Sequence, residues 1–95
     1  MKTVILDLTG CKSLWDIHER IRKAFGFPDW YGKNWDAFYD LLSRDCDAEH
    51  VIVRGEHTLP SEYSDQIKTM HSVFENTIKF CKKLNFSSFS YEIES

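Results

Sequence analysis

Two aspartates four residues apart, Asp36 and Asp40, have the spacing in this sequence that most needs a chemical explanation. They lie in the stretch YGKNWDAFYDLL, residues 31–42, where a helix is expected. Like charges at this spacing destabilise an isolated helix by roughly 0.2–0.5 kcal/mol, and an anion late in a helix opposes the helix dipole. Only Arg44 lies at a helical spacing that could offset Asp40. Such a pair could serve acid–base chemistry or accept hydrogen bonds from a basic partner.

Rotation by 100° per residue sorts this helix, expected over residues 35–44, into two faces. One face is apolar and should be buried: it holds Phe38, Leu41 and Leu42, with Trp35 at its edge. The opposite face holds Asp36, Asp40 and Ser43, with Tyr39 beside them. For an arbitrary amphipathic helix, the simplest interpretation of such a face is that it is merely exposed to solvent. The neighbouring sequence therefore has to show whether the face is also a binding surface.

The surroundings are acidic and aromatic. Between Asp29 and Glu49 there are six acids and two bases, a net charge of −4, whereas the remainder has nine acids and ten bases. Trp30 and Tyr31 precede the helix on a loop with Pro28 and Gly32, and their rings are not easily both buried. Aromatic anchors beside charges are typical of binding hot spots. Nucleic-acid-binding surfaces are basic, so direct nucleic-acid binding is not expected.

The remaining elements should position this helix. Buried runs predict strands at residues 3–8 and 51–54, and alternation over residues 88–94 predicts a third strand with one wet face. Apolar spacing predicts a first helix that starts at Ser13 and ends at Gly26, and a long helix over about 64–83. Asn34 is a suitable N-cap for the acidic helix. The connector at residues 55–60 allows a short helical turn.

Strands separated by helices favour parallel pairing through right-handed crossovers. We therefore expect one α/β domain over residues 1–95, with a small three-stranded parallel sheet and helices packed against it. The start of the chain lacks the apolar region of a signal peptide, and no segment approaches the ~18 apolar residues of a membrane span, so a cytoplasmic location is expected.

No cofactor or metal is expected. The alternating Asp45, Asp47 and Glu49 lack the glycine and distal glutamate of a calcium loop. The histidines show no metal-like pairing and are interpreted as surface or boundary residues: His18, His50, His57 and His71. The cysteines show no paired spacing and are interpreted as reduced, partly buried thiols: Cys11, Cys46 and Cys81.

The stretch WYGKNWDAFYDLLS resembles the binding loop and helix of the barstar-like ribonuclease inhibitor family. The matching positions are Tyr31, Gly32, Asn34, Asp36, Ala37 and Asp40. The similarity extends more loosely to the first strand, to LWDIHERIRKAFGFP, to VFENTIKF in the long helix and to the last strand. Asn76 and Phe80 stand where the family carries acids, Trp35 where a smaller aliphatic residue is usual, and Asp45 where an aromatic residue often occurs.

This resemblance implies a barstar-like fold and a protein that blocks the cationic active site of a barnase-like ribonuclease. Asp40 would take the place of an RNA phosphate, with Asp36 as a second acid. The implied contacts include Tyr31 and Gly32 against catalytic groups, Asn34 positioning the loop, and Ser43 at the rim. The full set of expected partner-binding residues is Trp30, Tyr31, Gly32, Asn34, Trp35, Asp36, Tyr39, Asp40 and Ser43.

Two other interpretations stay open at this point. The same acidic surface would suit an immunity protein against another toxin, or an adaptor for a different basic partner. An enzyme that uses Asp36 and Asp40 is less favoured, because an outward-facing helix lacks the enclosed pocket that separates two carboxyl pKa values. Neither a small-molecule substrate nor a membrane partner is expected.

Overall fold

The structure is a computed structural model that describes residues 3–44, 50–84 and 89–94. Three strands form one sheet in the order β1 (Thr3–Asp7), β2 (His50–Arg54) and β3 (Ser90–Glu94), and both pairings are parallel. The expected α/β fold with a three-stranded parallel sheet is confirmed. The expectations for Asp45, Cys46, Asp47 and Glu49 lie outside the described residues.

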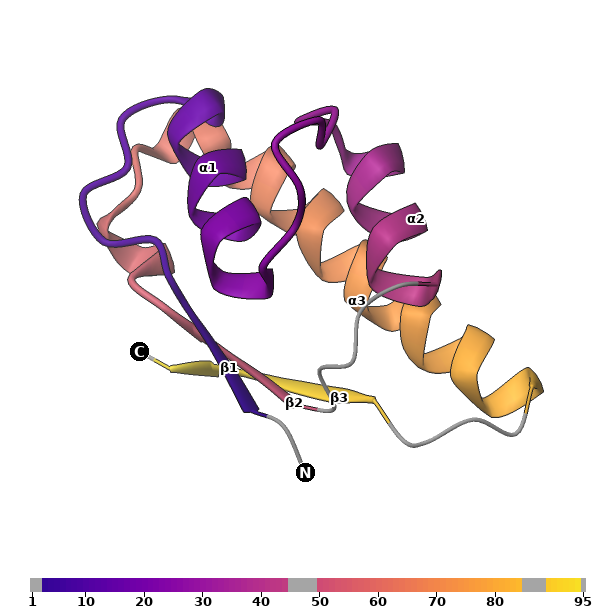
Figure 1. Cartoon of the computed structure of the whole chain (residues 1–95). Coiled ribbons are helices and arrows are strands. Elements are labelled where there is room, and N and C mark those ends of the chain that lie inside the picture. The colour runs from indigo at the N-terminus through magenta and orange to yellow at the C-terminus, as the bar shows by residue number, and fades with distance from the viewer. Residues whose placement is uncertain (1–2, 45–49, 85–88, 95) are drawn as a thin grey trace.

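All three helices lie on one face of the sheet: α1 (Leu14–Phe25), α2 (Trp35–Arg44) and α3 (Ser64–Lys83) (Figure 1). Two short 3-10 turns, Glu56–Thr58 and Ser61–Tyr63, connect β2 to α3. Along β1, Val4 and Leu6 are buried under the helices whereas Ile5 is exposed. The described fold therefore has two layers, a sheet and the helices packed on one of its faces.

The helix ends follow from local side chains. The Ser13 hydroxyl accepts a hydrogen bond from the Asp16 N–H at 3.1 Å, and the Asp16 carboxylate accepts one from the Lys12 N–H at 3.0 Å. Gly26 ends α1 in the left-handed conformation, with φ of 71°. The Asn34 side chain accepts a hydrogen bond from the Ala37 N–H at 2.7 Å and so caps α2. The predicted caps are confirmed.

The apolar face of α2 fixes its orientation. Phe38 is fully buried, and its ring lies 5.5 Å from that of Phe25 on α1 and 5.8 Å from that of Phe74 on α3. Leu41 and Leu42 are buried with it. Burying each such side chain contributes on the order of 1.5–3 kcal/mol. Rotation of α2 would expose all three, so the opposite face is held toward solvent.

Candidate protein-binding site

The acidic face of α2 points outward as predicted. Asp36 and Asp40 are exposed, whereas Tyr39 and Ser43 are half-buried. The Asp40 carboxylate pairs with the Arg44 guanidinium at 3.0 Å, and these two side chains are 55% and 73% exposed. An ion pair this exposed contributes about 0–1 kcal/mol. Asp40 is therefore compensated by a base of its own helix, but only weakly.

Ser43 lies at the end of this face with its hydroxyl already engaged. It donates a hydrogen bond to the main-chain carbonyl of Tyr39 at 2.7 Å. Its oxygen keeps lone pairs that can accept a bond from outside. Ser43 is thus suited to a rim contact, and its role toward a partner stays a prediction.

The two aromatic residues of the loop before α2 differ in their exposure to solvent. Trp30 is 74% exposed, whereas Tyr31 is only 3% exposed. The contact of Tyr31 with catalytic groups that the resemblance implies stays a prediction, but the unbound protein presents almost none of the Tyr31 ring at its surface. The reason is that its ring packs against Phe27 at 5.4 Å and its hydroxyl finds a hydrogen-bonding partner inside the protein.

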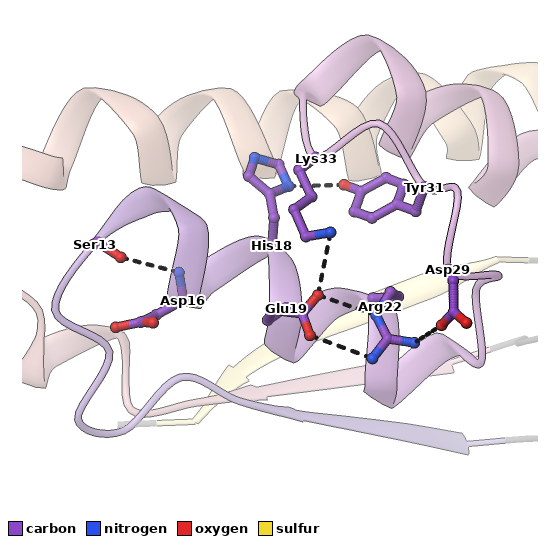
Figure 2. A network of polar contacts seen from close by, with 8 residues as sticks. All are labelled: Ser13, Asp16, His18, Glu19, Arg22, Asp29, Tyr31 and Lys33. Atoms are coloured by element: carbon purple, nitrogen blue, oxygen red, sulfur yellow. Dashed lines mark hydrogen bonds and ion pairs between the residues drawn. The ribbon is translucent and has the colours of Figure 1, made fainter.

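That inner partner is His18, which sequence reasoning had placed at the surface or boundary. His18 is 1% exposed, and its Nδ1 lies 2.7 Å from the Tyr31 hydroxyl (Figure 2). Burial lowers the pKa of His18 to about 4, with a further contribution from Lys33, and burial raises the pKa of Tyr31. The helical period contained the signal: His18 is four residues after Leu14 and three before Ile21, inside the apolar stripe of α1.

Charged residues tie both halves of the loop to α1 (Figure 2). Arg22 pairs with Glu19 at 3.0 Å and with Asp29 of the loop at 3.2 Å. Lys33 pairs with Glu19 at 3.4 Å, and its ammonium lies 4.4 Å from the centre of the Trp15 ring. Hydrogen bonds from Arg22 are the main cause that lowers the pKa of the Glu19 carboxyl. The loop that carries Trp30 is thereby held against α1.

Gly32 and Asn34 join this loop to α2. A Cβ on Gly32 would lie 3.3 Å from the Asn34 amide nitrogen, which is tighter than most packed contacts, and 3.4 Å from the Ala37 Cβ. The Asn34 side chain donates to the Gly32 carbonyl at 3.3 Å while it caps the helix. Both residues therefore fix how the loop enters α2. Direct contact with a partner stays a prediction for each.

Trp35 lies between helices rather than on the acidic face. Its indole N–H donates to the Gln66 side chain of α3 at 2.7 Å, and its ring centre is 4.4 Å from that of His18. The side chain is half-buried, as its place at the edge of the apolar face predicted. Its inclusion among the partner-binding residues stays a prediction, and its visible contacts serve packing.

Tyr39 faces α3, where the sequence departs from the acids implied by the resemblance. Tyr39 lines a hollow together with residues of α3, including Asn76 and Phe80. Glu75 does not replace the missing acid, because its carboxylate accepts a hydrogen bond from the Tyr91 hydroxyl of β3 at 2.7 Å. The surface beside Tyr39 is therefore chemically different from the acidic face of α2.

Within the described ranges, no cluster of three histidine, cysteine or acidic side chains could hold a metal ion. Within those same ranges, no helix is long and apolar enough to cross a membrane. Burial raises the pKa of the Cys11 thiol. It also raises the pKa of the Cys81 thiol, although Cys81 is only half-buried.

Comparison with known proteins adds the family. The model of the family described as "Barstar (barnase inhibitor)" matches residues 1–91. The chain belongs to the barstar family. A relative from Bacillus subtilis (strain 168), named "Putative ribonuclease inhibitor YrdF", is 27% identical over 71 residues, which cover 70% of this chain and 78% of the relative. The family is described as an inhibitor of an enzyme, so membership of this family favours a protein-binding role over an enzymatic one.

Proposed function

We propose that this barstar-family protein inhibits a barnase-like ribonuclease by covering the cationic active site with the acidic face of α2 and with Trp30. One observation carries the proposal: Asp36 and Asp40 are exposed on a helix whose other face is locked in the core. A rigid carboxylate needs little ordering when it binds, so more of its interaction energy remains for the complex.

Asp40 is the central acceptor in this proposal. Nucleases hold RNA phosphates with arginine, lysine and histidine, and a carboxylate accepts the same charge-assisted hydrogen bonds. Arg44 has to leave Asp40 when enzyme cations approach, but an exposed pair of this kind is easily exchanged. Inside the closed interface, lower local polarity strengthens the new contacts. RNA is excluded because its phosphate position is occupied.

Trp30 supplies apolar area beside the acids. Its ring is exposed, while the loop that carries it is held by the buried Tyr31 and by the partly buried ion pair of Lys33 with Glu19. An aromatic ring on such a loop buries a large area with few rotatable bonds, which is the usual character of an interface anchor. The role proposed for the aromatic loop therefore passes from Tyr31 to Trp30, with Tyr31 acting as the internal support.

The test is inhibition of RNA hydrolysis by purified protein added to barnase-like ribonucleases. Full cleavage at excess protein by every enzyme of the panel would refute the proposal. For an inhibited enzyme, Asp40→Ala should weaken binding by about 30-fold or more, because enzyme cations lose their partner in a closed interface. The free energy of unfolding of Asp40→Ala should differ from that of the wild type by less than about 1 kcal/mol.

Glu62→Ala is the matched control, since Glu62 is exposed on the turn Ser61–Tyr63 and its removal changes the net charge equally. Equal losses of affinity in Asp40→Ala and Glu62→Ala would reduce the acidic face to a general charge effect. An adaptor that binds elsewhere would bind the enzyme without slowing RNA cleavage. A cytoplasmic site of action belongs to the proposal and is tested by fractionation of the native cell.

A further inference from the structure

A hollow of about 370 Å³ adjoins the acidic face of α2. Its lining residues are Tyr39 from α2 and Asn76, Lys79, Phe80 and Lys83 from α3. The α3 residues follow the spacing i, i+3, i+4 and i+7, so they share one face of that helix. We call this surface the α2–α3 hollow.

The α2–α3 hollow is positively charged. Lys79 and Lys83 are exposed, and neither forms an ion pair with any residue in the described part of the chain. Glu75, the acid nearest in sequence on α3, is engaged by Tyr91. Two like charges one helical turn apart repel each other in the absence of a counter-charge. Glu75 keeps its negative charge four residues before Lys79 but forms no ion pair with either lysine, so both ammonium groups remain available to an anion from outside.

The hollow is continuous with the proposed inhibitory surface through Tyr39. Tyr39 precedes Asp40 in α2 and forms one wall of the hollow. A typical interface covers about 800 Å² on each partner, whereas α2 is about 15 Å long and one helix wide. An interface centred on Asp36 and Asp40 therefore extends beyond α2, and on the side of Tyr39 the adjoining surface is the hollow lined by Lys79 and Lys83.

We propose that the bound ribonuclease places an acidic side chain of its own, from the rim of its active site, in the α2–α3 hollow. This inference rests on the proposed function and specifies its partner. Lys79 and Lys83 would bracket the carboxylate, and the rings of Tyr39 and Phe80 would contact its aliphatic part. The target is then an enzyme with a cationic cleft flanked by an acid, whereas a uniformly basic rim would be repelled by the two lysines.

The experiment uses the ribonuclease that the wild-type protein inhibits most strongly in the panel above. Association and dissociation rates are measured for Lys79→Glu, Lys83→Glu and the control Lys82→Glu. Lys82 is exposed on the same last stretch of α3 but does not line the hollow. Lys82→Glu and Lys83→Glu both reverse a charge in the last turn, so they change net charge and the helix dipole interaction alike.

We expect Lys79→Glu and Lys83→Glu to dissociate at least 10-fold faster than wild type, and Lys82→Glu to stay within threefold. Replacing acids around the enzyme cleft by lysine, one at a time, should then identify one substitution that restores tight binding of Lys83→Glu. Thermal melts of the three variants should coincide, which excludes a folding defect confined to the hollow.

Two results would overturn the inference alone. In the first, wild type inhibits the enzyme but the hollow variants bind as well as Lys82→Glu. In the second, Lys79→Glu and Lys83→Glu lose affinity for a short RNA oligonucleotide while their binding to the enzyme is unchanged, which would assign the hollow to nucleic acid. Failure of the wild-type protein to inhibit any enzyme of the panel would refute the proposed function, and this inference with it.

Discussion

Lowering the pH from 7 to 5 should remove about 2 kcal/mol of folding stability through His18 alone. The side chain is 1% exposed, its Nδ1 is hydrogen-bonded to the Tyr31 hydroxyl, and its Nε2 is buried with no hydrogen-bond partner in the part of the chain that the structure describes. A second proton would place a positive charge in this site near Lys33, which also disfavours the charged ring. Protonation of His18 is therefore linked to unfolding.

The sign follows from the two pKa values. In the folded protein the pKa of His18 is lowered from 6.5 to about 4. The unfolded chain thus takes up the proton first as the pH falls below 6.5. The stabilisation is complete above that pH and is lost progressively until pH 4, for a total of about 3 kcal/mol. Between pH 7 and 5 the loss amounts to about 2 kcal/mol.

The assay is urea unfolding of the wild type and of His18→Asn at pH 7, 6 and 5. Asparagine keeps a polar atom near the Nδ1 position but does not titrate, so its own destabilisation is the same at each pH. The wild type should lose about 2 kcal/mol more than the variant between pH 7 and 5. Parallel pH dependences of the two proteins would refute the linkage, as would a titration of folded His18 by NMR near 6.5.

Three further changes test separate parts of the structure. Arg44→Gln removes the internal competitor of Asp40 and should strengthen ribonuclease binding about threefold, with less than about 1 kcal/mol change in stability; weaker binding would make Arg44 part of the contact. Association should slow by about 10-fold between low and physiological salt in stopped-flow measurements, and a flat response would reject electrostatic steering. Gly55→Ala should lower stability by about 1–3 kcal/mol, because φ is +78° and the new Cβ meets the Thr9 main chain; an unchanged urea midpoint would contradict this.

Local signals predicted the fold well because its elements are bounded by local chemistry. Ser13, Gly26 and Asn34 define helix ends through hydrogen bonds or backbone angles within a few residues. The long apolar period predicted α3 over Ser64–Lys83, and the alternation of strands and helices predicted parallel pairing. The outward direction of Asp36 and Asp40 followed from the same periodicity, since the buried half of α2 determines the exposed half.

The loop was predicted less well because it has no period. Trp30 and Tyr31 are neighbours of similar chemistry, and only the packing of α1 decides which one is buried. The pairing of Tyr31 with His18 spans 13 residues, and the Lys33 to Glu19 contact likewise joins the loop to a different element. No local rule identifies such partners. Sequence reasoning predicted the exposed acidic face of α2, but it did not predict that Tyr31 is buried while Trp30 is exposed.

The two aspartates therefore change the free energy of unfolding very little. Repulsion between Asp36 and Asp40 costs roughly 0.2–0.5 kcal/mol, and the exposed pair of Asp40 with Arg44 contributes a similar amount in the opposite sense. Stability thus neither requires the acids nor opposes them.

The loop shows an imbalance of a different kind. Lys33 adopts a left-handed conformation, with φ of 52°, which is unfavourable by about 1–2 kcal/mol for a residue with a Cβ. Its contacts with Glu19 and Trp15 offset part of that cost and hold the loop in one shape. A loop ordered before binding loses less entropy in the complex. The strained Lys33 and the buried Tyr31 both act inside the protein, and in the proposed function they would hold Trp30 and the acidic face in the orientation that binds the ribonuclease.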